Sequence, residues 1–188
     1  MDRVRSSLPW IAAGLLIGIG AGALLYFGFG PGKVWFQSSS PEAILPAVPE
    51  INKSAPDFML NTLDGRTIQL SKLRGSPVVL NFWATWCGPC RLEMPLLQEY
   101  ADQLGADVVF LPINNDESPE LVQKFVDELS LRLDFLLDPG AQVAQQYRVR
   151  GFPTTMFIDR DGTLRYQHIG VLNEELLIGY LQGIGAMQ

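Results

Sequence analysis

Residues 78–95 read VVLNFWATWCGPCRLEMP, an apolar run that leads directly into two cysteines separated by two residues. Cys87 and Cys90 are the only cysteines of the 188-residue chain. If the apolar run is a buried strand and the next segment a helix, Cys87 lies at a helix N-terminus, where free N–H groups and the dipole favour a thiolate. The spacing therefore predicts a reversible disulfide, in which Cys87 attacks another disulfide and Cys90, one turn away, resolves the mixed disulfide.

Other roles for this pair fit the sequence less well. A structural disulfide would close almost no loop, and the stability that a disulfide adds falls with loop length. A zinc site needs four ligands, and His168 is the only histidine, so the chain cannot supply a Cys/His set and no metal is expected. Pro89 suits a first helical turn, because proline lacks the N–H that this turn leaves unpaired.

Two stretches of the chain resemble the thioredoxin family. Residues 81–90 (NFWATWCGPC) are similar to the strand and helix start that carry the thioredoxin active site, and residues 91–95 (RLEMP) narrow the resemblance to the TlpA/ResA-like group. The second stretch is residues 149–159 (VRGFPTTMFID), followed by Asp161 and Gly162. Because these motifs are specific, the chain is identified as a member of this group of membrane-anchored bacterial thiol-disulfide oxidoreductases.

The resemblance also implies the residues of a catalytic site. The Cys87–Cys90 disulfide is the redox group, and no other cofactor is implied. Pro153 is expected to follow a cis peptide bond, in a loop that faces the sulfurs and pairs with an extended substrate. Glu93 is expected to be a functional acid that couples to thiol protonation, although a lone helical glutamate is usually solvated. Trp86 is expected to form a partly exposed apolar surface for the partner; the other expected substrate-binding residues are Gly88, Pro89 and Phe152.

The chain departs from ordinary thioredoxins at two positions. Asn81 occupies the place of their buried aspartate, and Pro112 falls near their buried lysine. Asparagine cannot take up a proton, so Glu93 would take over proton transfer during the exchange. Asn81 could simply satisfy backbone groups. Trp83 is expected to pack in the core, and His168, in a predicted strand, is expected to be structural.

The alternation of strand-like and helix-like segments predicts an α/β fold with a mixed central sheet flanked by helices, preceded by one transmembrane helix. The turn dipeptide at residues 64–65 indicates an N-terminal β-hairpin, and residues 119–141 are expected to be a central TlpA-type insertion. The expected strands are residues 58–60, 67–70, 78–83, 108–113, 134–137, 154–158 and 163–169. The expected helices are 89–104, with Leu92, Leu96, Leu97, Tyr100 and Leu104 on its apolar face, 119–129, 141–147, and a last helix capped by Asn173 that runs to Leu181.

The N-terminus has the features of a membrane anchor. Residues 6–32 carry no charge, and about twenty apolar residues suffice to cross a bilayer. We therefore expect a signal-anchor helix at 10–30; a cleaved signal peptide is the alternative, but its apolar region is usually shorter. The basic residues Arg3 and Arg5 favour a cytoplasmic segment at 1–9.

The expected anchor sets the location of the remaining chain. It places the rest outside the cytoplasm, on the bacterial cytoplasmic membrane. The Ser- and Pro-rich residues 31–54 are expected to be a flexible linker, and residues 55–188 the thioredoxin-like domain.

Composition and resemblance together narrow the function. The net charge of −6 does not suggest a nucleic-acid partner. The resemblance implies a reductase, kept reduced by a membrane electron donor, that acts on protein disulfides such as those of apocytochrome c or of copper-centre assembly proteins. A disulfide-forming oxidase and a non-catalytic or copper-binding assembly factor remain as alternatives. A peroxidase is weaker, because no cysteine follows the Pro-x-x-x-Thr-x-x pattern.

Overall fold

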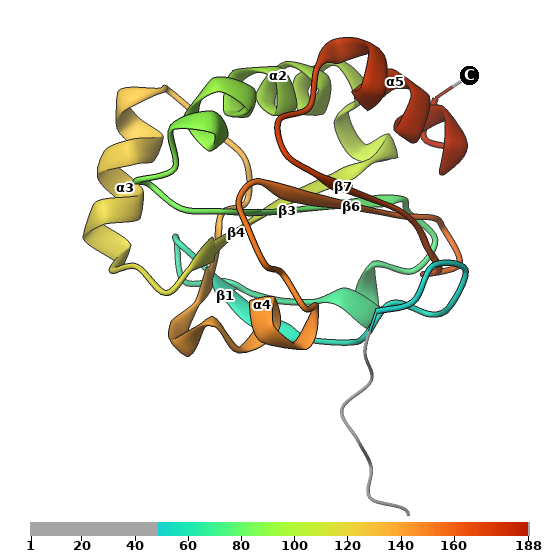
Figure 1. The fold of residues 1–188 in the computed structure, drawn as a ribbon, viewed down its shortest axis with the longest axis horizontal. Coiled ribbons are helices and arrows are strands. Elements are labelled where there is room, and N and C mark those ends of the chain that lie inside the picture. Colours follow the sequence, from blue (N-terminus) through green and yellow to red (C-terminus); the bar gives the residue numbers. More distant parts are fainter. Residues whose placement is uncertain (1–48, 188) are drawn as a thin grey trace, which may run out of the picture. The chain divides into compact units, whose positions relative to one another are not determined.

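The computed structural model describes residues 49–187, which contain one seven-stranded β-sheet (Figure 1). Its strands are β1 (Met59–Thr62), β2 (Thr67–Gln69), β3 (Val78–Trp83), β4 (Val109–Asn115), β5 (Leu136–Asp138), β6 (Thr154–Ile158) and β7 (Leu164–Ile169). Their order across the sheet is β2-β1-β5-β4-β3-β6-β7. β4 runs parallel to both β3 and β5, whereas the other neighbours are antiparallel. The expected mixed sheet is confirmed.

Helices cover both faces of this sheet. They are α2 (Gly88–Leu104), α3 (Pro119–Glu128), α4 (Gln142–Gln146) and α5 (Glu174–Gly183). Alternate side chains of β3 enter two apolar cores: Val79 and Trp83 pack with α2, α3 and α5, while Leu80 and Phe82 pack with α4. Figure 1 shows α2 and α5 on one side of the sheet and α4 on the other. By the same alternation, Asn81 directs a polar side chain from β3, an interior strand, toward α2.

Within residues 49–187, the strands and helices expected from the sequence are all present, with bounds that differ by two residues or fewer. Residues 78–83 and 154–158 form strands with the expected bounds, and both strands are buried along their whole length. Asn173 caps α5, because its Oδ1 accepts a hydrogen bond from the Leu176 N–H at 2.9 Å. The expected insertion supplies α3 and β5, and β5 fills the sheet between β1 and β4.

The buried face of α2 differs from the expected one. The prediction that Leu92 faces the core is wrong, because this side chain is 75% exposed. The stripe that meets the sheet instead contains Cys90, Glu93 and Met94, followed by Leu97 one turn later. This stripe follows the helical period of 3.6 residues from Cys90, and the same period places Leu92 on the opposite side of the helix. A charged residue type therefore occupies a buried helix position.

Residues 1–48 and 188 lie outside the described part of the chain, and so do the expected cytoplasmic segment, the expected anchor at 10–30 and most of the expected linker. Within residues 49–187, no helix combines the length and the hydrophobicity needed to cross a bilayer. The last residues of the expected linker contact the sheet. The Asn52 N–H donates to the Leu164 carbonyl at 2.7 Å, and the Leu164 N–H donates to the Lys53 carbonyl at 2.9 Å.

Candidate active site

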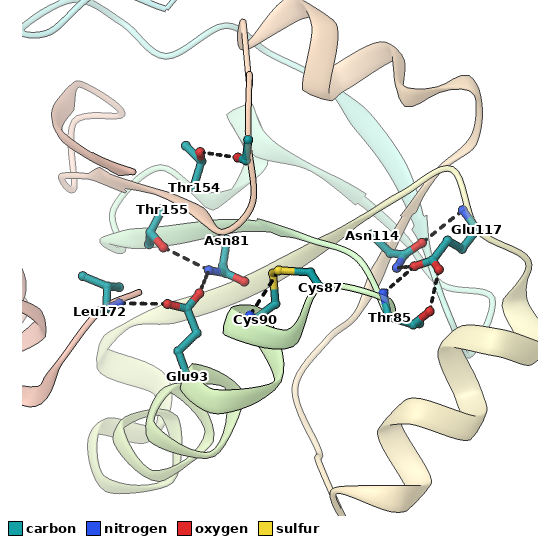
Figure 2. The surroundings of a disulfide bond; sticks show 11 residues. Asn81, Thr85, Cys87, Cys90, Glu93, Asn114, Glu117, Thr154, Thr155 and Leu172 are labelled. Carbon is teal, nitrogen blue, oxygen red and sulfur yellow. Dashed lines mark hydrogen bonds between the residues drawn. A yellow bond between two sulfur atoms is a disulfide. The ribbon is translucent and has the colours of Figure 1, made fainter. Parts of the chain in front are cut away.

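Cys87 and Cys90 lie where β3 gives way to α2, and they form a disulfide with an S–S distance of 2.07 Å and a Cα–Cα distance of 5.3 Å (Figure 2). Cys87 is the N-cap of α2, and its Sγ accepts a hydrogen bond from the Cys90 N–H at 3.2 Å. Pro89 occupies the first turn of the helix, as expected. Cys87 retains 5% exposure and Cys90 none, so Cys87 is the more accessible of the two. On reduction, the helix N-terminus favours a thiolate at Cys87.

The start of β6 brings a second segment to this place. Thr154 pairs with Phe82 near the end of β3, so the preceding residues lie beside the loop that leads to Cys87. The peptide bond between Phe152 and Pro153 is cis, as the resemblance implies. The Pro153 carbonyl accepts a hydrogen bond from the Gly170 N–H at 2.9 Å, which ties this loop to the loop after β7.

Aromatic side chains form a surface beside the disulfide. The Trp86 side chain is 70% exposed, and its ring contacts the half-buried Phe152 edge-on, with the ring centroids 5.8 Å apart. Gly88 and Pro89 are exposed next to Cys87. Three of the four expected substrate-binding residues are thus exposed in the segment that holds the cysteines, and the fourth, Phe152, contacts one of them. A large exposed aromatic side chain is typical of a binding surface.

Glu93 is fully buried on the face of α2 that meets the sheet. Its Oε1 accepts a hydrogen bond from the Asn81 side-chain amide at 2.7 Å, and its Oε2 accepts one from the Leu172 N–H at 2.9 Å (Figure 2). Burial raises the pKa of Glu93 to about 7, because desolvation of the carboxylate outweighs the two hydrogen bonds that favour it. A carboxyl with this pKa can gain or lose a proton near neutral pH.

The Asn81 side chain links Glu93 to the sheet and does not hydrogen-bond to the backbone of the described residues. Its amide nitrogen donates both to Glu93 and to the Thr155 hydroxyl, at 2.9 Å. Asn81 Oδ1 is buried and has no hydrogen-bond partner among the described residues. The expectation that Asn81 satisfies backbone groups is therefore wrong: its amide nitrogen donates to two side chains, Glu93 of α2 and Thr155 of β6.

Sequence reasoning missed Glu117, which lies just after β4. Glu117 Oε2 accepts hydrogen bonds from the Thr85 N–H and from the Asn114 amide, each at 2.7 Å, and its Oε1 accepts one from the Thr85 hydroxyl at 2.5 Å (Figure 2). One carboxylate thus links two segments: the turn at Thr85, which leads to Cys87, and the end of β4 at Asn114. The polar run that follows a buried strand, residues 114–118, was the available signal.

The remaining candidates have structural surroundings. Trp83 is buried against Phe125 and Phe135, as expected, with centroid distances of 4.5 and 5.5 Å. His168 lies on β7 and contacts Tyr180 of α5. No group of three or more histidine, cysteine, aspartate or glutamate side chains in residues 49–187 is arranged to hold a metal ion.

Comparison with known proteins shows what this arrangement is similar to. The family model described as AhpC/TSA matches residues 51–167. The thiol-disulfide oxidoreductase ResA of Bacillus thuringiensis is 38% identical over 136 residues, which cover 72% of this chain and 79% of ResA.

Two solved structures have the same fold. The exposed lipoprotein thioredoxin Etrx1 of Streptococcus pneumoniae is 32% identical with a TM-score of 0.62, covering 68% of this chain and 98% of Etrx1. A secreted Mycobacterium tuberculosis disulfide oxidoreductase homologous to Escherichia coli DsbE is 29% identical with a TM-score of 0.62, covering 67% of this chain and 95% of the other. The expected thioredoxin-like α/β fold is confirmed.

Proposed function

Because the chain belongs to the thioredoxin-like AhpC/TSA family and is a thiol-disulfide oxidoreductase of the ResA/DsbE type, we propose that it reduces disulfides of proteins outside the cytoplasm, with the haem-binding cysteines of apocytochrome c as its substrate. The cysteine pair is its redox group, as in its relatives, and protein thiols and disulfides are its substrates. The observation that carries the proposal is the Cys87–Cys90 disulfide at the N-terminus of α2, beside the cis-Pro153 loop and the exposed Trp86.

The geometry supports a two-step exchange. In the reduced enzyme, the Cys87 thiolate attacks one sulfur of the target disulfide, forms a mixed disulfide and releases the first target thiolate. The Cys90 thiolate then attacks Cys87 Sγ, which closes the Cys87–Cys90 disulfide and releases the second target thiolate. Two electrons pass from the enzyme to the target, and a membrane electron donor returns the enzyme to the dithiol.

The buried carboxyl of Glu93 is suited to manage protons during this cycle. We assign it the role of an acid that couples to thiol protonation, since its pKa of about 7 lets it exchange a proton at neutral pH. As an anion it raises the pKa of the neighbouring thiols. Replacing Glu93 by glutamine should therefore change the pH dependence of Cys87 alkylation in the reduced protein, and an unchanged profile would end this role.

The proposed surface for the target protein comprises Trp86, Gly88, Pro89 and Phe152, and the backbone of the Pro153 loop pairs with the target chain next to its disulfide. The proposed location is the outer side of the bacterial cytoplasmic membrane, with an anchor at 10–30 and a linker at 31–54. The uncharged residues 6–32 support this location, as do the descriptions "exposed lipoprotein" and "secreted" for two relatives.

A trapping experiment tests the substrate. The full chain with Cys90→Ser keeps the attacking Cys87 but cannot resolve the mixed disulfide, so it should retain its target when expressed in a bacterium that makes c-type cytochromes. Mass spectrometry should identify apocytochrome c, and a matched variant that also lacks Cys87 should retain nothing. A trap that holds copper-centre assembly proteins instead would overturn the cytochrome assignment.

Direction is tested separately by the reduction potential. A reductase should have a potential well below that of the strong oxidant DsbA, about −120 mV. A value near that of DsbA would mean that the protein forms disulfides. Full activity after Cys87→Ser, together with stoichiometric copper in the purified protein, would instead indicate a non-catalytic assembly factor.

A further inference from the structure

His168 lies on β7, directly opposite Thr155 of β6. Residues opposite each other on antiparallel strands direct their side chains to the same face of the sheet. Thr155 accepts a hydrogen bond from Asn81, which in turn binds Glu93 (Figure 2). The half-buried imidazole therefore lies on the face of the sheet that carries the Glu93 network.

Both ring nitrogens of His168 have a partner. Nε2 lies 3.3 Å from the Val171 carbonyl oxygen, and Nδ1 lies 3.4 Å from the Tyr180 hydroxyl. A carbonyl oxygen only accepts hydrogen bonds, so Nε2 must carry the hydrogen. In the neutral ring, Nδ1 is then free to accept from Tyr180, and the two contacts together specify one tautomer.

The Val171 carbonyl belongs to the same peptide group as the Leu172 N–H, which donates to Glu93 Oε2 at 2.9 Å. A peptide whose carbonyl accepts a hydrogen bond becomes a stronger donor at its N–H, because linked hydrogen bonds polarise one another. One peptide group thus connects the half-buried His168 to the fully buried Glu93.

We propose that His168 is a positioning residue for Glu93: through the Val171–Leu172 peptide it orients and strengthens the N–H that the Glu93 carboxylate accepts. His168 thereby stabilises the ionised form of Glu93 and makes this carboxyl a stronger acid. The inference deepens the proposed function, because it rests on Glu93 as the acid of the thiol exchange.

Among the described side chains packed around Glu93 and the Val171–Leu172 peptide, His168 is the only base. Tyr180 of α5 contacts the ring, and Tyr166 of β7 contacts Tyr180 in turn. On β3 and β6, the side chains that face Glu93 are Asn81 and Thr155, which do not titrate, and α2 contributes the two cysteines. At the start of α5, Glu174 accepts from the Tyr100 hydroxyl. Among the described residues, no lysine or arginine hydrogen-bonds to Glu93 or to His168.

The test is a direct titration of Glu93 by NMR in the oxidised full chain, held in detergent micelles and labelled with ¹³C at glutamate carboxyls. The Glu93 signal is the one that disappears in Glu93→Gln. His168→Phe keeps a ring beside Tyr180 but has no donor, so the midpoint of the Glu93 titration should rise by about 0.3 to 1 pH unit. The lower value corresponds to lost polarisation of the Leu172 N–H, and the upper value to a weakened hydrogen bond from this N–H to Glu93. His168→Gln, whose amide can donate to the Val171 carbonyl, should restore most of the wild-type midpoint.

The control is Gln167→Ala, at an exposed neighbour on β7 that should leave the Glu93 midpoint unchanged. A wild-type midpoint in folded His168→Phe overturns the inference. If that variant does not fold, ¹⁵N shifts of the His168 ring in the wild-type protein decide: a hydrogen on Nδ1 instead of Nε2 would exclude donation to Val171, and a hydrogen on Nε2 supports it. An unchanged Cys87 alkylation profile in Glu93→Gln would instead refute the catalytic role of Glu93, without affecting this direct readout.

Discussion

Glu93 should make the folded protein less stable as the pH rises through neutrality, and replacing Glu93 by glutamine should remove this effect. The fold raises the pKa of this carboxyl from 4.5 to about 7, so between these values the folded state binds a proton that the unfolded chain has released. The resulting stability is complete below the unfolded pKa and is lost as the pH rises through the folded pKa. At about 1.4 kcal/mol per pH unit, the loss amounts to about 3 kcal/mol.

The assay is urea unfolding of the oxidised full chain in mild detergent, at pH values from about 5 to about 9. The free energy of unfolding of the wild-type protein, minus that of Glu93→Gln, should fall by about 3 kcal/mol across this range. Glutamine has one side-chain oxygen where Asn81 and Leu172 supply two donors, so the variant should also carry a constant cost. A constant cost does not alter the slope.

Other groups do not produce this slope. Carboxyls whose pKa the fold lowers titrate at more acidic pH, and tyrosines whose pKa it raises titrate at more alkaline pH. They are Asp57, Asp64, Glu120 and Asp159, and Tyr100 and Tyr147, respectively. Groups common to both proteins cancel in the difference. A wild-type-minus-variant difference that stays constant from about pH 5 to about pH 9 would show that Glu93 is not the protonated buried group inferred here.

Three further changes test other parts of the site and its support. Glu117→Ala removes the acceptor of the Thr85 N–H and the Asn114 amide, and should cost about 2 to 3 kcal/mol in urea unfolding. Glu120→Ala, at an exposed position of α3, should cost much less, and equal costs would contradict the bracing role of Glu117. Asp138→Ala leaves the buried N–H groups of Val143 and Ala144 without their acceptor and should cost a similar free energy of unfolding. Asp138→Asn should recover part of this cost, because its one side-chain oxygen still accepts a hydrogen bond; no recovery would mean that Asp138 acts through packing. Trp86→Ala should leave the midpoint of thermal unfolding almost unchanged, because the side chain is 70% exposed. It should slow the reduction of protein disulfides but not that of a small-molecule disulfide. Equal slowing of both reactions would mean that Trp86 acts in the chemical step and not in binding the partner.

The sequence predicts the buried strands well and the contacts between distant segments poorly. β3 could be placed to the residue because a strand buried on both faces is a nearly continuous apolar run, and β6 because it precedes the turn residues Asp161 and Gly162. The orientation of α2 was misjudged because leucine spacing placed Leu92 inside, whereas the helix turns Cys90 and Glu93 toward the sheet. A glutamate gives no sign from its type that it will be buried.

The partners of the site residues depend on tertiary structure. Leu172, which binds Glu93, lies in a loop far along the chain, and local spacing cannot show that its N–H reaches α2. The same holds for Glu117, whose contact with Thr85 exists only because β3 and β4 end side by side. The resemblance supplied Glu93 and Pro153, but not the groups that hold them.

The position of β5 determines the order in which this sheet can be completed during synthesis. β5 fills the gap between β4 and β1, so the hairpin at residues 59–69 cannot join the rest of the sheet until Asp138 has been made. At a synthesis rate of about 5 to 20 residues per second, the ribosome needs about 3 to 14 seconds to pass from Gln69 to Asp138. β1 presents an unpaired edge throughout this interval, and β4 presents one once residue 115 has been made; such edges are templates for aggregation. A ribosome stalled between residues 115 and 136 would therefore hold two separate strand pairs, β1–β2 and β3–β4, without the strand that joins them.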